Sequence, residues 1–414
     1  MCMRVLYVQM VSSPHSPVDG STMSMMHLIK SFPPGEVQAR VLCPPGKVAE
    51  FLQKNGVDWS AIPSVSLLQS TAGIPIRGAR RLDVLRALWD TRHGGVIRRI
   101  VSEWRPDLVH LNERGMLHAA RAVDQIGVPV VMHARQVADP TNSVVHSRSI
   151  QWINRHVART IAIDESVRSS LRGIQRCEVV YNPLPESLLS SPGPERPGAL
   201  RNGTGDEMNV TYLATLSTVK GVWDLLEAAD RLRNHRGIRF SLVGGNSRSA
   251  AFHKSLIGRV ARVLGLASDT ERKLTEAIGI RRLENIRLLG RVSDIQTVLA
   301  GTDLLVFPSH LNGPGRAVFE AGVMGIPSIV AMKDKVEDVV QHGVTGLIVP
   351  ERNPVELAAA IQRLADDPSL RVRMGAAARE RYVRQFDPRC AAEAVLGIYR
   401  QIVTARSQRA VDQQ

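Results

Sequence analysis

The clearest chemistry in the sequence lies at residues 309–320, where a loop of Ser, His, Asn, Pro and Gly leads into a helical segment. Gly313 and Gly315 permit close approach of the backbone to a ligand, and the free N–H groups at the helix start favour an anion. Glu320 follows about one turn into the helix, within reach of hydroxyl groups on the same ligand. A compound that carries both phosphate and sugar hydroxyls would satisfy this arrangement.

The elements around this loop form a strand–loop–helix–strand unit. A short apolar run, Leu304 to Phe307, precedes the loop, and a second run opens at Gly325 and Pro327. Two such runs are expected to pair in parallel. In that arrangement the ligand lies at the carboxyl end of the first strand and faces the helix start.

A second candidate anion site follows the apolar run 209–213. Lys220 and Gly221 stand in a loop between that run and an amphipathic helical segment, 222–232. The order strand, loop, Lys-Gly, helix suits an anion site. The alternative is an exposed lysine that merely precedes a helix.

The first half of the chain contains several further apolar runs, which predict buried parallel strands. One of them ends at His133, and Arg135 follows two residues later. Ligands gather at the carboxyl ends of such strands, although a histidine at that position could also be purely structural. The predicted strands are residues 3–8, 37–43, 106–110, 128–133, 160–163 and 179–181.

The loop after the first strand leads into a helix predicted at residues 22–31. Asp19, Gly20 and Ser21 end this loop, at the carboxyl end of a predicted strand, where ligands can bind. The equally weighted alternative is a plain turn in which Asp19 or Ser21 is the helix N-cap.

The organisation of the chain predicts an α/β protein of two Rossmann-like domains. A chain of 414 residues is long enough for two or three domains. Residues 186–208 are dense in Pro, Gly and Ser and predict a linker. We therefore expect one domain at 1–185, a second, ligand-binding domain at 209–388 and a closing helix at 389–414.

The composition is that of an ordinary globular protein with a strong positive charge. The net charge is +14, with 44% hydrophobic and 22% charged residues. This charge asks for an anionic partner, but aromatic residues are only 4% and no nucleic-acid-binding module is recognised, so nucleic acid is not expected. We find no apolar run long enough to span a membrane and no signal-peptide pattern, and the four scattered cysteines indicate free thiols in a reducing compartment.

These motifs resemble the family-4 glycosyltransferases of GT-B fold. In that family a Glu-x7-Glu pattern precedes a Gly-x-Pro strand start; Glu320 matches the second Glu, and Gly325, Ile326 and Pro327 match the strand start. The family's Gly-Arg-Leu-x-x-x-Lys-Gly loop is matched at Lys220 and Gly221. The sequence departs from the family at Asn312, where the first Glu is expected, and at Thr215, where the Arg is expected.

The resemblance implies a metal-independent, retaining transfer of a sugar from a nucleotide-diphosphate donor to a glycan or lipid-linked acceptor. The helix beyond residue 389 would return to the first domain. The implied catalytic residues are Lys220, His133 and Glu320. The implied donor-binding residues are Thr215, Gly244, Arg291, Asn312, Gly313, Gly315, Arg316 and Glu320. The implied acceptor or phosphate side is Asp19, Gly20, Ser21 and Arg135.

Two alternatives stay open on the same scaffold. A nucleotide-sugar 2-epimerase would need a pair of carboxylates facing the sugar ring, and no such pair is found at the expected positions. The departures at Thr215 and Asn312 could instead mark a degenerate subunit that only binds a nucleotide-sugar or a partner.

Two basic segments raise the hypothesis of contact with an anionic membrane, and hence of a cytoplasmic enzyme on the inner leaflet. Residues 251–267 read as a helix with one apolar and one basic face, and residues 77–99 are rich in arginine. The alternative for both is a solvated helical surface packed on its own domain.

Overall fold

The structure is a computed structural model. It describes residues 2–9, 18–62, 91–114, 116–138, 143–190, 207–246, 255–256, 269–292, 294–311, 313, 315–333, 337–338 and 340–412. The chain divides into two compact units, the first made of residues 1–185 and 385–414 and the second of residues 186–384.

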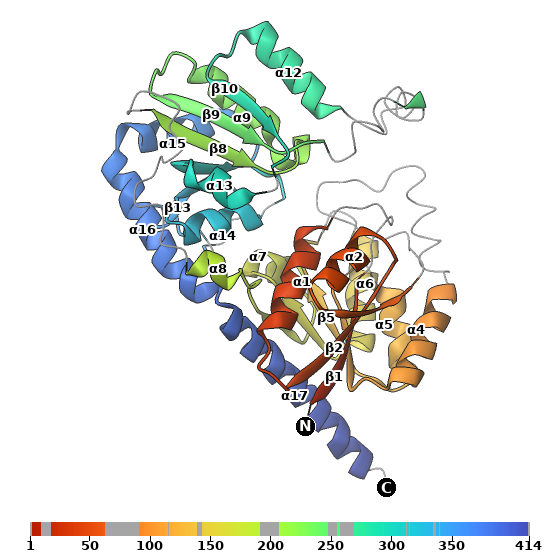
Figure 1. The fold of residues 1–414 in the computed structure, drawn as a ribbon. Helices are drawn as coiled ribbons and strands as arrows, with labels where there is room; N and C mark the ends of the chain where they lie inside the picture. The colour runs from red at the N-terminus through yellow and green to blue at the C-terminus, as the bar shows by residue number, and fades with distance from the viewer. Residues whose placement is uncertain are drawn as a thin grey trace. The chain divides into compact units, whose positions relative to one another are not determined.

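The first unit contains a parallel sheet of seven strands in its described part, in the order β3-β2-β1-β4-β5-β6-β7 (Figure 1). The strand order reverses between β1 and β4, where Val5 pairs with both Ala39 and Leu108. The strands are β1 (Met3–Val8), β2 (Val37–Cys43), β3 (Asp58–Ala61), β4 (Leu108–Leu111), β5 (Val130–Ala134), β6 (Arg159–Ala162) and β7 (Cys177–Val179). The helices are α1 (Gly20–Ser31), α2 (Lys47–Lys54), α4 (Thr91–Trp104), α5 (Leu117–Asp124), α6 (Ser143–His156), α7 (Glu165–Ser170) and α17 (Pro388–Asp412).

Helices cover both faces of this sheet, which is why its strands are apolar throughout. Along β1, Val5 and Tyr7 belong to one hydrophobic cluster, and Leu6 and Val8 belong to another. The first cluster includes side chains of α1, α2 and α17, and the second includes those of α4, α5 and α6 (Figure 1). This alternation is the pattern of a parallel sheet buried on both sides.

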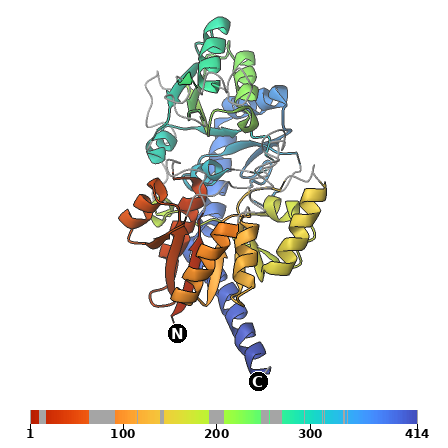
Figure 2. The same cartoon turned by 90° about the vertical axis from the view of Figure 1, so that its right-hand side faces the viewer.

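The last helix, α17, packs in the first unit although it follows the second unit in the sequence. Val395, Tyr399 and Ile402 are buried in the cluster that contains β1 and α1. Figure 2 shows this helix running along the first sheet. It therefore brings the end of the chain to the first strand.

The second unit has a parallel sheet of six described strands, in the order β10-β9-β8-β11-β12-β13. Its order reverses between β8 and β11, which pair in parallel at Leu304 and Val210. The strands are β8 (Met208–Leu213), β9 (Ile238–Val243), β10 (Ile286–Gly290), β11 (Leu304–Phe307), β12 (Ser328–Ala331) and β13 (Gly346–Val349). The helices are α8 (Glu186–Leu189), the 3-10 turn η1 (Thr218–Lys220), α9 (Val222–Arg231), α12 (Thr270–Arg281), α13 (Ile295–Ala300), α14 (Arg316–Val323), α15 (Pro354–Asp366) and α16 (Pro368–Gln385).

One large apolar cluster holds the second unit together. Tyr212 of β8 and Phe240 of β9 pack in it with Leu225 of α9, Leu274 of α12 and Ile361 of α15. The sequence prediction of two Rossmann-like parallel-sheet units is confirmed. The last strand of the first sheet lies at Cys177–Val179, slightly before its predicted place.

Some predictions concern segments outside the described residues. These include Asn312, the arginines of residues 77–90 and, apart from residues 255–256, the basic helix predicted at 251–267. No helix in the described ranges combines the length and the apolar character that a membrane crossing requires.

Candidate active site

The second unit gathers its predicted residues at the point where its strand order reverses. The loop after β8 and the loop after β11 meet there: the backbone N–H of His310 donates to the carbonyl of Val219 at 2.9 Å. The Ser309 hydroxyl reaches the same carbonyl at 3.5 Å. Ligands of open parallel sheets bind outside the carboxyl ends of the strands at such a point.

Lys220 is held in this site by a tight backbone turn. It ends η1, and Ser217 caps that turn by accepting a hydrogen bond from the Lys220 N–H at 3.3 Å. Gly221 adopts a left-handed conformation with φ of 71°. A Cβ at Gly221 would lie 1.7 Å from the carbonyl oxygen of Pro308, so only glycine lets the two loops approach this closely.

The ammonium group of Lys220 keeps its charge available for a ligand. Its Nζ lies 5.2 Å from the centre of the Phe307 ring. Burial lowers the pKa of Lys220 from its ordinary value. No carboxylate among the described residues forms an ion pair with it. A partly desolvated cation without a carboxylate partner is suited to an anionic ligand.

Asp224 and His310 form a pair that the sequence analysis did not predict. The Asp224 carboxylate and His310 Nε2 are 2.7 Å apart, and both side chains are mostly buried. The pair ties the first turn of α9 to the loop after β11. The sequence shows a polar residue after each of the two strands beside the reversal point. It does not show that the two residues meet, because they are 86 positions apart.

Arg316 and Glu320 lie together on the first turns of α14. Arg316 Nε donates to Glu320 Oε1 at 2.7 Å. Gly315 is the N-cap of this helix and provides no side-chain cap, so the helix start keeps N–H groups free of such a partner. Gly313 is in the loop just before it. Arg316 and Glu320, both implied as donor-binding residues, are thus paired with each other.

Thr215, Gly244 and Arg291 lie in the loops after neighbouring strands of the same sheet. Gly244 has a φ of 149°, and a Cβ there would lie 1.9 Å from the Ala214 carbonyl oxygen. The Thr215 side chain is exposed, and its carbonyl accepts a hydrogen bond from the Tyr212 hydroxyl at 2.9 Å. Arg291 is exposed and donates to the Asn246 carbonyl. The resemblance implies two cations in the loop after β8, an arginine and a lysine. Lys220 supplies one of them, and Thr215, at the arginine position, supplies no charge.

In the first unit, His133 and Arg135 are brought together at the carboxyl end of β5. Arg135 Nη2 lies 3.3 Å from His133 Nδ1, and Arg135 Nε donates to Asn112 Oδ1 at 2.9 Å. Arg135 also donates to the Asn182 side chain. Burial, assisted by the charge of Arg135, lowers the pKa of His133 well below its ordinary value.

These contacts determine the tautomer of His133. A guanidinium can only donate, so Nδ1 accepts from Arg135 and the ring proton resides on Nε2. Nε2 is buried and has no hydrogen-bond partner in the described part of the chain. The side chain as a whole is only 1% exposed. His133 is therefore a neutral imidazole with one unused donor.

A buried chain of hydroxyl groups and imidazoles backs this histidine. The Tyr7 and Tyr399 hydroxyls are 2.9 Å apart, and the Tyr399 hydroxyl lies 2.5 Å from His110 Nδ1. The His110 and His133 rings are 5.4 Å apart between centres. Burial lowers the pKa of His110 to about 3. Since Tyr399 lies on α17, the last helix of the chain supports the carboxyl edge of the first sheet.

The predicted acceptor-side loop ends as a helix cap. Asp19 Oδ1 accepts from the Thr22 N–H at 2.8 Å and from the Ser21 hydroxyl at 2.9 Å. Gly20 begins α1 and is exposed. The carboxylate of Asp19 is thus engaged by its own helix, which is the structural alternative stated for this loop.

Glu113 lies at the carboxyl edge of the first sheet, and the sequence analysis did not predict it as a site residue. It lies two residues after the end of β4 and is 5% exposed. Burial raises the pKa of Glu113 to about 8, against the opposing effect of the Arg135 charge. A carboxyl that is protonated near neutral pH can donate a hydrogen bond as well as accept one.

Comparison with known families finds a match in each unit. The family described as "Glycosyl transferase 4-like domain" matches residues 19–185. The family described as "Glycosyl transferases group 1" matches residues 202–381. Together the two matches account for most of both units.

Two relatives are similar to this chain over most of its length, at low sequence identity. The chain is 27% identical to the glycogen synthase of Mycobacterium tuberculosis over 312 residues, which are 72% of this chain and 69% of the relative. It is 26% identical to the alpha-D-kanosaminyltransferase of Streptomyces kanamyceticus over 297 residues, 67% of this chain and 72% of the relative.

Solved structures with a similar fold include HepE of Anabaena in complex with UDP, with a TM-score of 0.74 and 20% identity over 96% of this chain and 100% of that one. The same protein in complex with UDP-glucose has a TM-score of 0.73 and 19% identity over the same shares of the chains. The sucrose-phosphate synthase of Thermosynechococcus elongatus has a TM-score of 0.71 and 16% identity over 97% of this chain and 100% of that one. At these identities the likeness concerns the fold.

Proposed function

Because this chain belongs to the group 1 glycosyltransferases of GT-B fold, we propose that it moves a hexosyl unit from a nucleotide-diphosphate sugar to an acceptor hydroxyl. In this reaction the bond between the anomeric carbon and the diphosphate breaks, a bond to the acceptor oxygen forms, and the hydroxyl proton is lost. The observation that carries the proposal is Lys220: a half-buried ammonium group at the strand reversal, without a carboxylate partner in the described residues.

Lys220 stabilises the charge that builds up on the leaving diphosphate. A cation that is already positioned needs no reorganisation at the moment of bond breaking, so it stabilises the transition state more than a mobile one does. The N–H groups at the start of α14 add to this stabilisation, since Gly315 leaves them uncapped. The Asp224–His310 pair keeps the two loops in register.

Arg316 and Glu320 exchange partners when the donor binds. In the free protein each neutralises the other at 2.7 Å. A diphosphate would compete for Arg316 and release the Glu320 carboxylate for the hydroxyl groups of the ribose. Asn312, which lies outside the described residues, is assigned to the sugar hydroxyls. Thr215, Gly244 and Arg291 shape the part of the site that holds the nucleotide.

On the first unit, His133 and Arg135 serve the acceptor or the phosphate side. The Nε2–H of His133 is a buried donor that the described contacts leave unused, and Arg135 contributes positive charge behind it. Because the pKa of His133 is low, the imidazole acts as a neutral hydrogen-bond donor rather than as a cation. Asp19, Gly20 and Ser21 line the approach from α1.

We further propose a uridine nucleotide donor, a retaining outcome and no requirement for a metal ion. The first is supported by the UDP and UDP-glucose complexes of a protein with the same fold. The second and third follow from the resemblance to the family-4 glycosyltransferases, whose members are retaining and need no metal ion. Synthesis of a polysaccharide or glycolipid by a cytoplasmic enzyme at the inner leaflet fits the glycogen synthase relative and the net charge of +14.

The experiment is a turnover assay with a panel of nucleotide-sugars, beginning with UDP-glucose, in the presence and absence of a metal chelator. Release of nucleoside diphosphate that depends on an added acceptor is the expected result, and it should be unchanged by the chelator. The anomeric configuration of the product tests retention. Binding of a nucleotide-sugar without any turnover would instead indicate the degenerate subunit, and conversion of the free donor to its 2-epimer would indicate the epimerase.

A further inference from the structure

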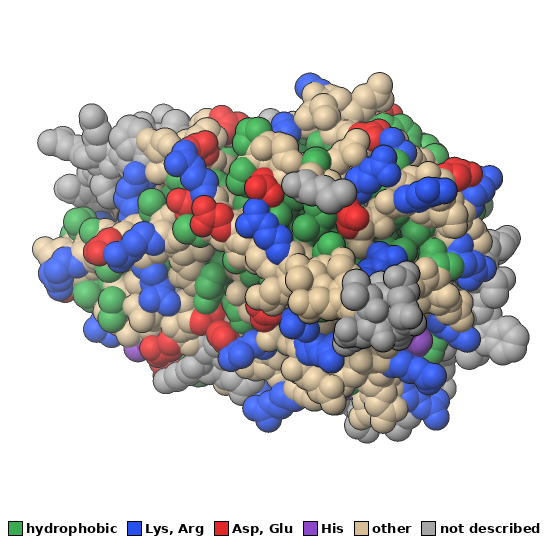
Figure 3. Space-filling model, turned by 90° about the horizontal axis from the view of Figure 1, so that it is seen from below, with side chains coloured by type: hydrophobic (Ala, Val, Ile, Leu, Met, Phe, Trp, Pro, Cys, Tyr) green, Lys and Arg blue, Asp and Glu red, His purple; other side chains and the backbone are tan. Residues whose placement is uncertain are grey.

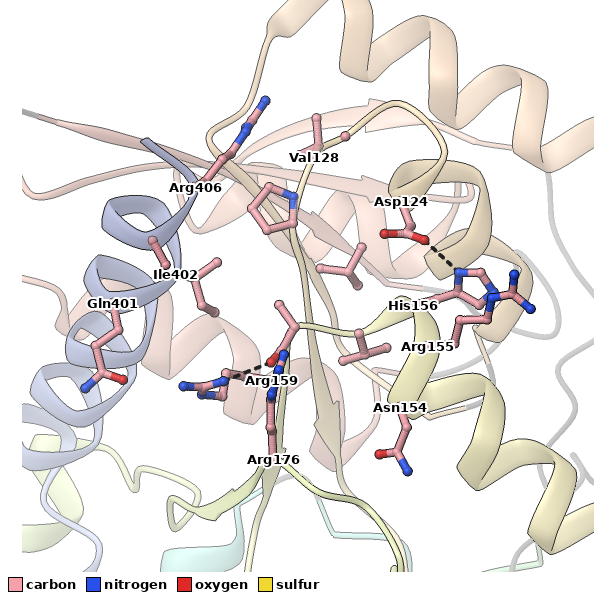
Figure 4. A pocket seen from close by; sticks show the side chains of 16 residues that line it. Asp124, Val128, Asn154, Arg155, His156, Arg159, Arg176, Gln401, Ile402 and Arg406 are labelled. Atoms are coloured by element: carbon pink, nitrogen blue, oxygen red, sulfur yellow. Dashed lines mark hydrogen bonds and ion pairs between the residues drawn. The ribbon is translucent and has the colours of Figure 1, made fainter. Parts of the chain in front are cut away.

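A pocket lies at the amino edge of the first sheet, opposite the edge that carries His133 and Arg135. It reaches from the starts of β5 and β6 and the residue before β7 to the helix α17 (Figure 4). Its volume is about 640 Å³. Pockets of roughly 300–1,000 Å³ are the ones that hold small molecules in proteins. Nothing in the proposed transfer reaction uses this edge.

Four arginine residues line the pocket, and they come from separate parts of the unit: Arg155, Arg159, Arg176 and Arg406. The lining contains one carboxylate, Asp124, and that carboxylate already bonds to His156 at 2.7 Å. The charge that faces the cavity is therefore positive, and it is not balanced from within.

The four arginines differ in how far their charge is already used. Arg159 pairs with Glu178 at 3.4 Å, and Arg406 reaches the Asp107 carbonyl at 3.4 Å. Arg155 and Arg176 form no ion pair with any residue that the structure describes. In Figure 4, Arg159 and Arg176 stand on one side of the cavity, Arg155 on another and Arg406 above it.

Part of the pocket wall is apolar. It consists of Val128, Pro129, Val130, Val157 and Ile402, of which Ile402 comes from α17. A purely hydrophilic ion would leave these apolar side chains exposed to water, whereas a ligand with an apolar part would cover them. The face seen in Figure 3 shows lysine and arginine side chains at many places, with hydrophobic surface between them.

From these observations we propose that the pocket binds an organic phosphate monoester, with the phosphate among the arginines and an apolar group against the wall beside Ile402. Arginine suits this role because its fork of N–H donors matches the oxygens of a phosphate. The ligand has two sources of the same chemistry: the phosphate monoester headgroup of phosphatidic acid, or a free phosphorylated metabolite. Either would bind at a site separate from the transfer reaction.

The test uses the full chain and three soluble probes: hexyl phosphate, hexanol and inorganic phosphate, each titrated by calorimetry. We expect saturable binding of hexyl phosphate, at least about tenfold tighter than that of either partial probe, and weakening as salt is raised. Equal binding of hexyl phosphate and inorganic phosphate would overturn the proposed role of the apolar wall. Absence of saturable hexyl phosphate binding would overturn the pocket itself.

A matched pair of variants separates the pocket from the general positive charge. Arg176→Glu with Arg406→Glu should weaken hexyl phosphate by about tenfold or more. The control, Arg148→Glu with Arg172→Glu, makes the same change of charge at exposed positions of the same unit outside the pocket and should bind as the parent does. Equal losses in both double variants would contradict the proposal. If the glutamate pair unfolds the protein, the corresponding Arg→Gln pair takes its place, with the same expectation.

The source of the phosphate is distinguished by sedimentation with vesicles. If the ligand is a lipid headgroup, the parent and the control variant sediment with phosphatidylcholine vesicles that contain phosphatidic acid, but not with phosphatidylcholine alone, and the pocket variant does not. If the ligand is a free metabolite, hexyl phosphate binds, but neither the parent nor any variant sediments with the vesicles. Both results retain the pocket, while sedimentation of the pocket variant equal to that of the parent would exclude it as the lipid contact.

Discussion

At the carboxyl edge of the first sheet, polar side chains are bonded to one another: Arg135 to Asn112 and to His133, and Tyr399 to Tyr7 and to His110. At the corresponding edge of the second sheet, the backbone does most of the positioning. Gly221 lets two loops touch, and Lys220 stands between them without a carboxylate partner in the described residues.

The difference teaches what each edge is prepared to do. A buried network whose members satisfy each other holds its residues rigidly and leaves few groups for a ligand. A loop that the backbone positions, with one cation that has no carboxylate partner in the described residues, can use the charge of that cation to stabilise an anionic ligand. On the proposed function, the first edge would orient an acceptor, and the second would stabilise the charge of the leaving group. The variants below would break or sharpen this contrast.

The largest expected effect is on the backbone of the second edge. Gly221→Ala forces a Cβ into the Pro308 carbonyl oxygen and strains a left-handed φ, so the free energy of unfolding should fall by about 4 kcal/mol in urea titrations. Gly279→Ala is the control: it lies in α12 with open space at the Cβ and should stabilise the protein by up to about 1 kcal/mol. Similar small effects from both changes would show that the two loops are not held by this contact.

The next effect tests the first edge through pH. Burial raises the pKa of Glu113 to about 8 from an ordinary value of 4.5. Between these values the unfolded chain has lost the proton that the folded chain keeps, so this carboxyl lowers stability as the pH rises. Glu113→Gln should therefore stabilise the protein at pH 8 by about 3.5 kcal/mol relative to its effect at pH 5.

Urea titrations of the Glu113→Gln variant and the parent at the two pH values provide the measurement. Glu103→Gln is the control, because that side chain is 69% exposed and should show little difference between the two pH values. A Glu113 variant whose effect is the same at pH 5 and pH 8 would mean that this carboxyl is ionised in the folded protein.

A smaller loss should follow from removing one hydroxyl of the buried chain. Tyr399→Phe deletes the group that joins Tyr7 to His110 and leaves a buried imidazole nitrogen without a partner. Stability should fall by about 1.5 kcal/mol, while the affinity for nucleotide should be unchanged, since no described contact links this hydroxyl to the second edge. Unchanged stability, or weakened nucleotide binding, would remove the distinction between the two edges.

The smallest expected effect concerns the ion pair of α14. Glu320→Gln keeps the shape of the side chain but removes the charge that faces Arg316 and the proposed ribose site. The affinity for free UDP, measured by calorimetry, should fall by about threefold to tenfold because a charge-assisted hydrogen bond becomes a neutral one. Unchanged affinity would leave Glu320 with only its structural role beside Arg316.

Much of the second edge could be predicted from the sequence because its parts are local. The apolar runs before Lys220 and before Ser309 indicated strands, and the carboxyl ends of parallel strands share one edge. Met3–Val8 and Leu304–Phe307 are strands as predicted. The period of apolar residues and the turn residues were sufficient for these elements.

The contacts that could not be predicted join residues far apart in the sequence. Tyr7 and Tyr399 are separated by 392 positions, and no local pattern indicates which face of α17 meets β1. The same holds for Asp224 with His310, and for the arginine pocket, whose residues come from several elements. The burial that shifts the pKa of Glu113 likewise depends on neighbours from different strands. Such features follow from the assembled unit and not from any one segment.

The most direct test of the central claim is the kcat of Lys220→Ala at saturating donor, measured with the nucleotide-sugar that the turnover panel identifies. If Lys220 stabilises the leaving diphosphate, kcat should fall by about a hundredfold, which corresponds to roughly 3 kcal/mol of transition-state stabilisation. Lys220→Arg, which keeps a positive charge, should recover part of this loss, and an unchanged thermal unfolding midpoint would show that the fold is intact. A kcat within about threefold of the parent would contradict the account.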